Sequence, residues 1–270
     1  MRIVVVISLW LVSSIWGWGA ADSSSGMRGA PLRTVSNTAF GVGEELYFKI
    51  RYEFVTAGKA AFKVLPKIVS CDNGRRCYDI RFYVRSLKSL DWLYRVRNYY
   101  RTLVDVDGLF PWYFEQHIRE GGYRRDFRAA FDHYRNLVYV GDTAYQIPPF
   151  VHDVVSAFFY VRTLPLDTMR AGDTLYLQNF YKDRVYDLKV VIRGREIVDV
   201  EAGRFRTIVI EPLVQEGGLF KSEGSILIWL SDDERKIPVQ VSTKVLIGSI
   251  YAELVGYRGL RGPLTAKITR

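Results

Sequence analysis

The sequence contains few of the residues that usually carry catalysis or bind metals. Only two of its 270 residues are cysteine and three are histidine. The histidines, His117, His133 and His152, lie far apart and lack the spacing of a helical zinc pair such as H-E-x-x-H. The sequence also lacks a G-x-S-x-G motif, which would expose a nucleophilic serine. We therefore predict no catalytic residue, no metal site and no cofactor, and enzymatic activity is not favoured.

Long apolar runs are confined to the N-terminus. Arg2 is followed by the apolar run Ile3–Trp18 and then by Gly19-Ala20-Ala21, which is the layout of a secretory signal peptide. We expect residues 1–21 to be a signal peptide; the alternative is a retained anchor, although the run is shorter than the roughly 20 residues that span a bilayer. No later uncharged run approaches this length, so we expect no transmembrane span after cleavage.

The remaining chain divides into three parts by composition. Residues 22–38 include Ser23-Ser24-Ser25-Gly26 and few large apolar residues, which predicts a flexible linker because little surface can be buried there. Residues 39–260 contain no second segment of this kind and are long enough for a sizeable core, which predicts a single β-rich domain. Residues 261–270 are expected to be a flexible C-terminal tail.

The chain is basic. It has 38 Lys and Arg residues against 29 Asp and Glu residues, a net charge of +9. Loss of Arg2 with the signal peptide leaves 37 basic residues against 29 acidic ones, or +8. In an exported protein this surplus favours anionic lipid, lipopolysaccharide or acidic glycans as partners rather than nucleic acid. The alternative is that the charge only aids solubility.

Cys71 and Cys77 are the two cysteines, and the sequence between them contains the tight-turn signal Asn73-Gly74. The flanking segments are typical of strands. In an oxidising compartment this arrangement predicts a structural disulfide across a hairpin. A redox motif would place the cysteines closer together, as in C-x-x-C, and a metal site would need more ligands.

Alternation of residue type with a period of two dominates the rest of the chain. In Leu46–Tyr52 the odd and even positions separate onto two faces, which predicts a strand. Turn signals such as Asp107-Gly108 and Gly121-Gly122 separate further runs of this kind, at residues 91–107, 124–139, 174–192, 205–212, 225–229 and 239–254. Many long strands joined by short turns predict a mainly β fold with a large, curled antiparallel sheet, like a barrel or half-barrel.

One segment breaks this alternation. After Pro148-Pro149, residues 152–163 are typical of a short helix, in which Asp153, Ser156 and Tyr160 would share one face. These residues could form a polar site at the mouth of a cavity. The simpler interpretation, which we favour, is that Asp153 caps the helix N-terminus and that the other two side chains satisfy their neighbours.

Four separated motifs resemble an exported bacterial family, the domain of unknown function 3108. The motifs span nearly the whole chain after the leader, in the family's order and spacing: Gly43-Glu44-Glu45-Leu46 through Ala57-Gly58-Lys59-Ala60; Asp153-Val154-Val155-Ser156 with Tyr160-Val161-Arg162; Ala202-Gly203-Arg204-Phe205; and Ile228-Trp229-Leu230-Ser231-Asp232-Asp233 with Ile237-Pro238-Val239. The resemblance implies a β-rich protein of the cell envelope of a Gram-negative bacterium, in the periplasm or associated with the envelope. It carries over no catalytic residue.

A basic and aromatic segment is the most suggestive surface. If residues 92–101 form a strand, Arg95, Arg97, Tyr99 and Arg101 share one face, and Tyr94, Val96 and Tyr100 share the other. The segment Tyr123–Arg128, which includes Arg125, has a similar composition. Arginine side chains here could hold phosphate or carboxylate groups while aromatic rings cover an apolar or sugar surface. The alternative is a solvated sheet face on which arginine stems pack over aromatic rings.

These observations lead to three hypotheses for function. The first is a non-enzymatic exported envelope protein that binds an amphipathic or anionic molecule, namely a lipid, glycolipid or glycan, in the concavity of its sheet. Its candidate ligand-binding residues are Arg95, Arg97, Tyr99, Arg101, Arg125, Asp153 and Tyr160. The second is an envelope scaffold or assembly factor that binds another envelope protein. The third is a hydrolase of envelope polymers, for which Asp153 is the first carboxylate to test.

Overall fold

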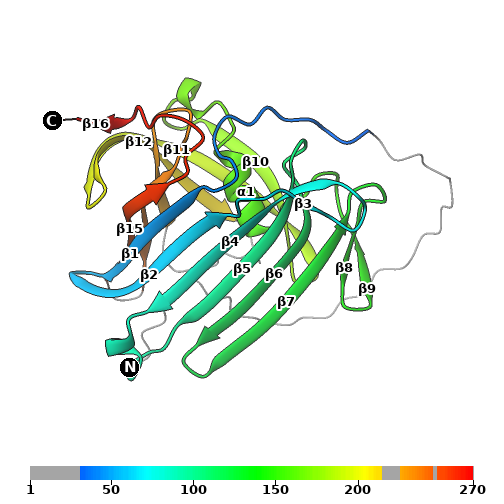
Figure 1. Cartoon of the computed structure of the whole chain (residues 1–270), viewed down its shortest axis with the longest axis horizontal. Helices are drawn as coiled ribbons and strands as arrows, with labels where there is room; N and C mark the ends of the chain where they lie inside the picture. Colours follow the sequence, from blue (N-terminus) through cyan, green and yellow to red (C-terminus); the bar gives the residue numbers. More distant parts are fainter. Residues whose placement is uncertain (1–30, 215–225, 246–247, 270) are drawn as a thin grey trace.

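The strands join into one large antiparallel sheet that curls around a helix (Figure 1). The computed structural model describes residues 31–214, 226–245 and 248–269. Its elements are β1 (Glu45–Tyr52), β2 (Val55–Val64), β3 (Val69–Ser70), β4 (Arg76–Ser86), η1 (Lys88–Leu90), β5 (Arg97–Asp105), β6 (Pro111–Glu120), β7 (Tyr123–Asp132), β8 (Leu137–Val140), β9 (Thr143–Gln146), α1 (Val154–Val161), η2 (Leu166–Thr168), β10 (Thr174–Tyr181), β11 (Arg184–Val200), β12 (Gly203–Val214), β13 (Ile226–Ser231), β14 (Pro238–Lys244), β15 (Ser249–Arg258) and β16 (Lys267–Ile268).

The order of the strands makes the sheet an open spiral. Neighbouring strands follow the order β10-β11-β12-β13-β14-β15-β1-β2-β4-β5-β6-β7-β8-β9, with β16 beside β12 and β3 beside β4. The pairing of β15 with β1 joins the two ends of the described chain into one sheet. Over the described ranges, β10 and β9 end the order and do not pair with each other. The predicted mainly β, curled antiparallel sheet is therefore confirmed, and it does not close.

Register shifts interrupt several of the strand pairs and help the sheet to curl. One lies in the pairing of β1 with β15, another in that of β1 with β2, and a third in that of β5 with β6. The longest strand, β11, is paired irregularly with β12 between Ile192 and Gly194, and Gly194 has a φ of 141° that favours glycine. Such irregularities bend a strand and increase its twist. They make the sheet concave on the face that α1 covers.

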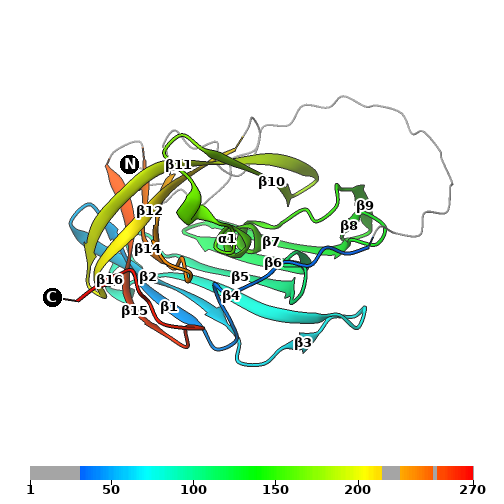
Figure 2. The ribbon, with the colours of Figure 1, turned by 90° about the horizontal axis from the view of Figure 1, so that it is seen from above.

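Helix α1 lies between the two walls of the curled sheet. Figure 2 shows the helix end-on, with β4, β5 and β6 on one side and β10 and β11 on the other. The chain passes from one end of the sheet, β9, through α1 to the other end, β10. The helix begins after Asp153, whose side chain caps it. The prediction of one helix around residues 152–163 and of a capping role for Asp153 is confirmed.

Segments on either side of the sheet's core are also packed against it. The signal peptide predicted for residues 1–21 lies outside the described residues. The described part of the expected linker contacts the sheet, because Val35 N donates to the Asp107 carbonyl at 2.8 Å. Near the other end, Ala266 is fully buried and its amide donates to Asp233 Oδ2 at 2.9 Å. The next two residues form β16, so the ordered sheet extends into the segment that we expected to be a flexible tail.

Four of the expected runs differ clearly from the strands of the structure, and one of them, 239–254, is divided between β14 and β15. The strand expected at 91–107 begins only at Arg97, because η1 and a turn occupy the preceding residues. The runs at 124–139 and 174–192 are each interrupted by a turn, where Asn136 and Lys182 adopt positive φ values of 55° and 62°. Alternation continues across these turns in the sequence, so it does not show where a hairpin reverses the chain.

The predicted hairpin of Cys71 and Cys77 is present, and the two residues form a disulfide. Gly74 has a φ of 78°, and its amide donates to the Cys71 carbonyl at 2.8 Å, which closes the turn. The disulfide packs in a small apolar cluster with Phe110 and Trp112. Because Phe110 and Trp112 are buried, the disulfide lies in the packed interior, as a structural disulfide does.

Candidate functional site

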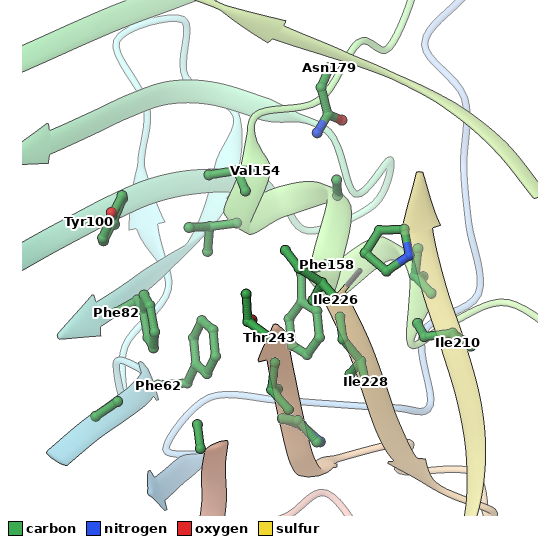
Figure 3. A pocket seen from close by; sticks show the side chains of 18 of the residues that line it. Phe62, Phe82, Tyr100, Val154, Phe158, Asn179, Ile210, Ile226, Ile228 and Thr243 are labelled. Atoms are coloured by element: carbon green, nitrogen blue, oxygen red, sulfur yellow. The ribbon is translucent and has the colours of Figure 1, made fainter. Parts of the chain in front are cut away.

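A cavity of about 270 Å³ lies between α1 and the concave face of the sheet. Figure 3 shows side chains from the sheet and the helix converging on it. The sheet contributes residues from both walls, and α1 contributes Val154, Val155, Ala157, Phe158 and Val161. Most of the other lining side chains are also apolar: Phe48, Ala60, Phe62, Phe82, Ile118, Leu188, Val190, Ile210, Pro212, Ile226, Ile228, Pro238, Val241 and Ala252.

A row of aromatic rings forms one wall of the cavity. The rings of Phe62 and Phe82 stack with centroids 4.1 Å apart, and Phe158 of α1 stacks on Phe62 at 5.4 Å. Tyr100 continues the row, 5.7 Å from Phe82. Strand register produces this row, since Phe62 pairs with Phe82, Phe82 with Tyr100, and Tyr100 with Gln116. The row runs from an apolar end at β2 to a polar end at β6.

Four polar side chains line the cavity: Tyr100, Gln116, Asn179 and Thr243. Burial raises the pKa of the Tyr100 phenol, with the Glu120 carboxylate as a second cause. Gln116 Nε2 donates to the Tyr181 hydroxyl at 3.3 Å. Asn179 is 3 % exposed, and its Oδ1 has no hydrogen-bond partner among the described residues. Three of the four therefore lie where β5 and β6 face β10.

Asp153 lies beneath the helix rather than on the surface of a cleft. Its Oδ1 accepts hydrogen bonds from the amides of Val155 and Ser156 at 2.7 and 3.0 Å, and its Oδ2 accepts from Thr102 Oγ1 at 2.7 Å. Ser156 Oγ in turn accepts from the Asp153 amide, which completes a capping box. Burial raises the pKa of Asp153, and these hydrogen bonds oppose that shift. The carboxylate is thus occupied by the helix N-terminus and β5.

Tyr160 belongs to a packed network at the other side of the same helix. The Arg33 guanidinium lies 4.4 Å from the centre of the Tyr160 ring, and that ring stacks on His152 at 4.8 Å. Arg33 Nη2 lies 3.2 Å from His152 Nε2, so this ring nitrogen acts as the acceptor. Burial first, and then the Arg33 charge, hold the pKa of His152 well below its usual value. The contact between Arg33 and Tyr160 therefore packs the segment that contains Arg33 against α1.

A buried ion pair fixes the end of α1. Arg162 and Glu44 are 0 % and 1 % exposed and form two hydrogen bonds, of 2.7 and 3.0 Å. The Arg162 guanidinium also donates to the carbonyls of Ala39 and Arg235. The sequence analysis did not identify this pair, although both residues lie in motifs of the family resemblance. The sequence signal that could have pointed to Glu44 and Arg162 is that each of them belongs to a family motif.

The outer face of the sheet carries the arginine and tyrosine residues that the sequence analysis grouped together. Arg97, Tyr99 and Arg101 lie on β5 with side chains directed away from the cavity, whereas the intervening Tyr100 lines it. The Arg97 guanidinium contacts Asp91, with Nη1 3.1 Å from Oδ1. Arg95 precedes β5 and is exposed, so it does not belong to the face of that strand as we expected.

Carboxylates neutralise the middle of this outer face. Asp79 accepts hydrogen bonds from both Arg81 and Arg101, each at 3.0 to 3.1 Å. Burial alone would raise the pKa of Asp79, but the two arginines outweigh it and hold the pKa below its usual value. Arg81 and Arg101 are therefore engaged by a carboxylate that is only 2 % exposed.

Arg125 differs from the other candidate arginines because it lies on the inner face. It pairs in register with Ile118, which lines the cavity. Phe127, two residues further along β7 and on the same face, is buried. Its guanidinium lies 4.8 Å from the centre of the Tyr181 ring. Of the seven candidate residues, Arg125 is thus the one whose charged group lies beside the polar end of the cavity.

The described residues contain neither a metal-binding cluster nor a helix that could span a membrane. Across residues 31–214, 226–245 and 248–269, no group of three or more His, Cys, Asp or Glu side chains is arranged to hold a metal ion. Within the same ranges, no helix has the length and apolar character needed to cross a membrane.

Comparison with protein families identifies the chain. The model of the family "Protein of unknown function (DUF3108)" matches residues 47–255, so the chain belongs to this family. Among curated proteins, none matches the sequence. The residues of the family motifs have structural roles here: Asp153 and Ser156 cap α1, and Glu44 and Arg162 form the buried ion pair.

Several solved structures resemble this one. A β-barrel-like protein of the domain of unknown function DUF1849 from Brucella abortus is 12% identical, with a TM-score of 0.51, and the match covers 80% of this chain and 97% of that chain. A protein with a YmcC-like fold from Bacteroides fragilis is 12% identical, with a TM-score of 0.33 and coverage of 85% and 100%. A hypothetical protein from Chlamydia trachomatis is 9% identical, with a TM-score of 0.36 and coverage of 86% and 94%. The first likeness concerns the fold alone.

Proposed function

We propose that this member of the DUF3108 family is an exported, non-enzymatic protein of the cell envelope that binds the hydrocarbon chain of an amphipathic molecule in its cavity. The observation that carries the proposal is the apolar cavity between α1 and the concave face of the sheet. The N-terminal sequence, with its apolar run and small residues, supports export. The ligand class is a lipid or glycolipid.

The lining of the cavity supports a hydrocarbon ligand. Phe82 and Phe158 each stack on Phe62, and the three side chains offer uncharged ring faces and edges to the cavity. Transfer of each methylene group from water into such surroundings contributes about 0.8 kcal/mol. A volume of about 270 Å³ is close to the lower limit of roughly 300 Å³ for small-molecule pockets, which suits one chain better than a whole multi-chain lipid.

The position and contacts of Asp153 argue against the hydrolase hypothesis. A catalytic carboxylate must reach a substrate, and it needs a pKa matched to proton transfer. The oxygens of Asp153 are occupied by two backbone amides and Thr102. Asp153 supports α1 and does not line the cavity, and no carboxylate is among the described residues that do. Binding without chemistry is the simpler function for this lining.

The test uses two substitutions on one strand. Ala60→Phe on β2 places a phenyl group in the cavity, whereas Ala61→Phe places the same group on the opposite face of the sheet. Binding is measured with N-phenyl-1-naphthylamine, an uncharged apolar probe whose fluorescence rises in apolar surroundings. The mature protein and the A61F variant should bind the probe, and A60F should bind it at least tenfold more weakly.

A second measurement identifies the natural ligand. The protein is purified from the envelope of its source, and co-purifying molecules are extracted into organic solvent and identified by mass spectrometry. Wild-type and A61F samples should yield the same lipid, and A60F should yield much less of it. Equal probe binding by A60F and A61F would contradict the proposal. A stoichiometric protein partner together with an empty cavity would instead support the scaffold hypothesis.

A further inference from the structure

We infer that the molecule bound in the cavity has an anionic head group, and that Arg125 and Asn179 hold this group where β6 and β7 face β10. This inference rests on the proposed function and deepens it, since it names the chemical class of the ligand: a single-chain amphiphile with a carboxylate or phosphate group. Four observations carry it. Among the described residues, the Asn179 Oδ1 atom has no hydrogen-bond donor and Arg125 has no carboxylate partner. The other two are a second cation beside Arg125 and the distance between the two ends of the site.

The amide of Asn179 is the first observation. Asn179 lies on β10, is 3 % exposed and lines the cavity, toward which its side chain points in Figure 3. Its Oδ1 accepts no hydrogen bond from any described residue. A buried polar atom left in this state costs about 1–3 kcal/mol, so such atoms usually have a partner. A ligand group that carries an O–H, such as a singly ionised phosphate monoester, would donate this missing hydrogen bond, and Asn179 Nδ2 can donate to its other oxygens.

The charge of Arg125 is the second observation. Its side chain lies on the inner face of β7, directly beside Ile118 of the cavity wall. The guanidinium packs against the rings of Tyr181 and Phe127, 4.8 and 5.8 Å from their centres. Within the described part of the chain, no carboxylate lies within ion-pair distance of it, in contrast with Arg97 and Arg101. Apart from its contact with the Tyr181 hydroxyl, its fork of N–H donors is therefore available to an anion.

Lys182 adds a second positive charge at the same place. Its Nζ lies 5.6 Å from the centre of the Tyr181 ring, which Arg125 also contacts. Partial burial first, and then the charge of Arg125, hold the pKa of Lys182 below its usual value. An anion between the two cations would relieve their repulsion. Tyr181 of β10 is 1 % exposed and accepts a hydrogen bond from Gln116. Its ring contacts both Arg125 and Lys182.

The nearest carboxylates have other partners. Glu120, on the same face as Arg125, accepts a hydrogen bond from Asn98 Nδ2 at 2.6 Å. Asp126 adjoins Arg125 in sequence but faces outward, where it contacts His117 and Arg119 at 2.7 and 2.8 Å. Neither of these contacts involves Arg125.

The distance from the aromatic wall of the cavity to Arg125 fits one hydrocarbon chain. From Phe62 on β2 to Arg125 on β7 the inner face crosses four strand spacings of about 4.8 Å, which is roughly 19 Å. A chain lying along the row of aromatic rings would place its head group beside Arg125. The amide of Asn179, which can donate and accept, would then lie across the cavity from the aromatic wall, within reach of an ester or phosphate oxygen.

The experiment compares two amphiphiles with the same twelve-carbon chain below their micelle concentrations: dodecyl phosphate and dodecyl maltoside, whose head group is uncharged. Dissociation constants are measured by displacement of N-phenyl-1-naphthylamine. Since hydrogen bonds to charged groups contribute about 1.5–3 kcal/mol, the wild-type protein should prefer dodecyl phosphate by about ten- to hundredfold. The Arg125→Gln variant should lose this preference. Its matched control, Arg124→Gln, changes the neighbouring residue on the outer face and should keep it.

The Asn179→Leu variant separates a ligand contact from a structural role. It removes an Oδ1 atom that accepts no hydrogen bond from any described residue, so it should raise the melting temperature of the free protein while weakening dodecyl phosphate binding severalfold. A structural residue would show the opposite effect on melting. Binding of the uncharged probe should persist in both R125Q and N179L, since the apolar wall remains.

Each outcome is decisive. Equal affinity of the wild-type protein for the two amphiphiles, or a preference that survives in R125Q, would overturn the head-group inference while leaving the proposed chain-binding function in place, provided that the uncharged probe still binds. Failure of the wild-type protein to bind the probe or either amphiphile would overturn both. Loss of the preference in R124Q as well as in R125Q would assign it to general surface charge and contradict the inference.

Discussion

The two faces of the same sheet use similar residues differently. On the outer face, Arg97 and Arg101 of β5 are engaged by Asp91 and Asp79. On the inner face, the side chains between them along the strand are buried, and Tyr100 lines an apolar cavity. The inner arginine, Arg125, has aromatic neighbours and no carboxylate partner among the described residues. An arginine-rich strand therefore indicates an anion site only where the fold leaves the charge unpaired.

The largest expected effect concerns the ion pair that holds α1 over the inner face. Arg162→Met leaves the Glu44 carboxylate buried without its partner, which should lower the free energy of unfolding by about 3–5 kcal/mol. Urea denaturation followed by circular dichroism measures the change. Arg97→Met, which breaks a partly exposed pair on the outer face, is the control and should have a much smaller effect. Equal losses in the two variants would contradict this distinction between the faces.

Acid should destabilise the protein through its buried histidines. Burial lowers the pKa of His133 to about 4, from an ordinary value of 6.5. Below pH 6.5 the unfolded chain therefore binds a proton that the native His133 does not, and the stability of the native state falls with pH. Between pH 6.5 and pH 5 this contribution is about 2 kcal/mol, at 1.36 kcal/mol per pH unit. His152, whose pKa is also lowered by burial, should add to it.

Urea denaturation at pH 7 and at pH 5 measures this dependence. The His133→Gln variant removes the titrating group and should show a smaller difference between the two pH values than the wild-type protein. The variant should be less stable than wild type at pH 7, because His133 Nε2 donates to the Pro111 carbonyl at 2.8 Å. A wild-type stability that does not change between pH 7 and pH 5 would show that these histidines are not buried in the neutral form.

Loss of the helix cap should have a smaller effect. Asp153→Ala removes the acceptor for two backbone amides and for Thr102, and removal of such a cap costs about 1–2 kcal/mol. Because α1 covers the cavity, binding of the uncharged probe should weaken in parallel with stability. Asp153→Asn keeps one acceptor oxygen and should recover part of both. A variant that keeps full stability but loses binding would assign Asp153 to the ligand instead.

The smallest expected effect concerns the outer arginines. The double variant Arg97→Gln with Arg101→Gln removes two charges whose carboxylate partners lie on the same face. Affinity for dodecyl phosphate should change by less than about twofold, since the binding region lies across the sheet and salt screens distant charges. Displacement of the fluorescent probe measures this. A loss as large as that of Arg125→Gln would move the anion site to the outer face.

The sequence predicted the parts of this structure that depend on local patterns. The curled antiparallel sheet follows from the period of two and the turn signals, the disulfide from Cys71 and Cys77 around Asn73-Gly74, and the cap from Asp153 before an apolar segment. These features involve residues close together in the chain. Their physical causes are the alternation of strand faces, turn geometry and the unsatisfied amides of a helix N-terminus. Local sequence patterns therefore predict them.

The sequence predicted a concave sheet, but it did not predict which residues line the cavity or how the arginines pair, because both depend on residues distant in the chain. Phe158 reaches the ring of Phe62 only because the chain returns through α1 between the two ends of the sheet. Arg101 meets Asp79 because the register of β4 and β5 places them together, and the alternation of residues does not specify that register. The strand face of Arg97, Tyr99 and Arg101 was correct, but which face is concave could not be inferred from the pattern.

The most direct test of the account is to locate a bound chain on one face of the sheet. The mature protein is irradiated with a fatty acid that carries a photoreactive diazirine near the end of its chain, and the labelled residues are identified by peptide mass spectrometry. The account predicts labelling at the inner-face residues Phe62, Phe82 and Phe158, with little labelling in A60F. Labelling concentrated on the outer-face residues Tyr99 and Arg101, unchanged in A60F, would contradict it.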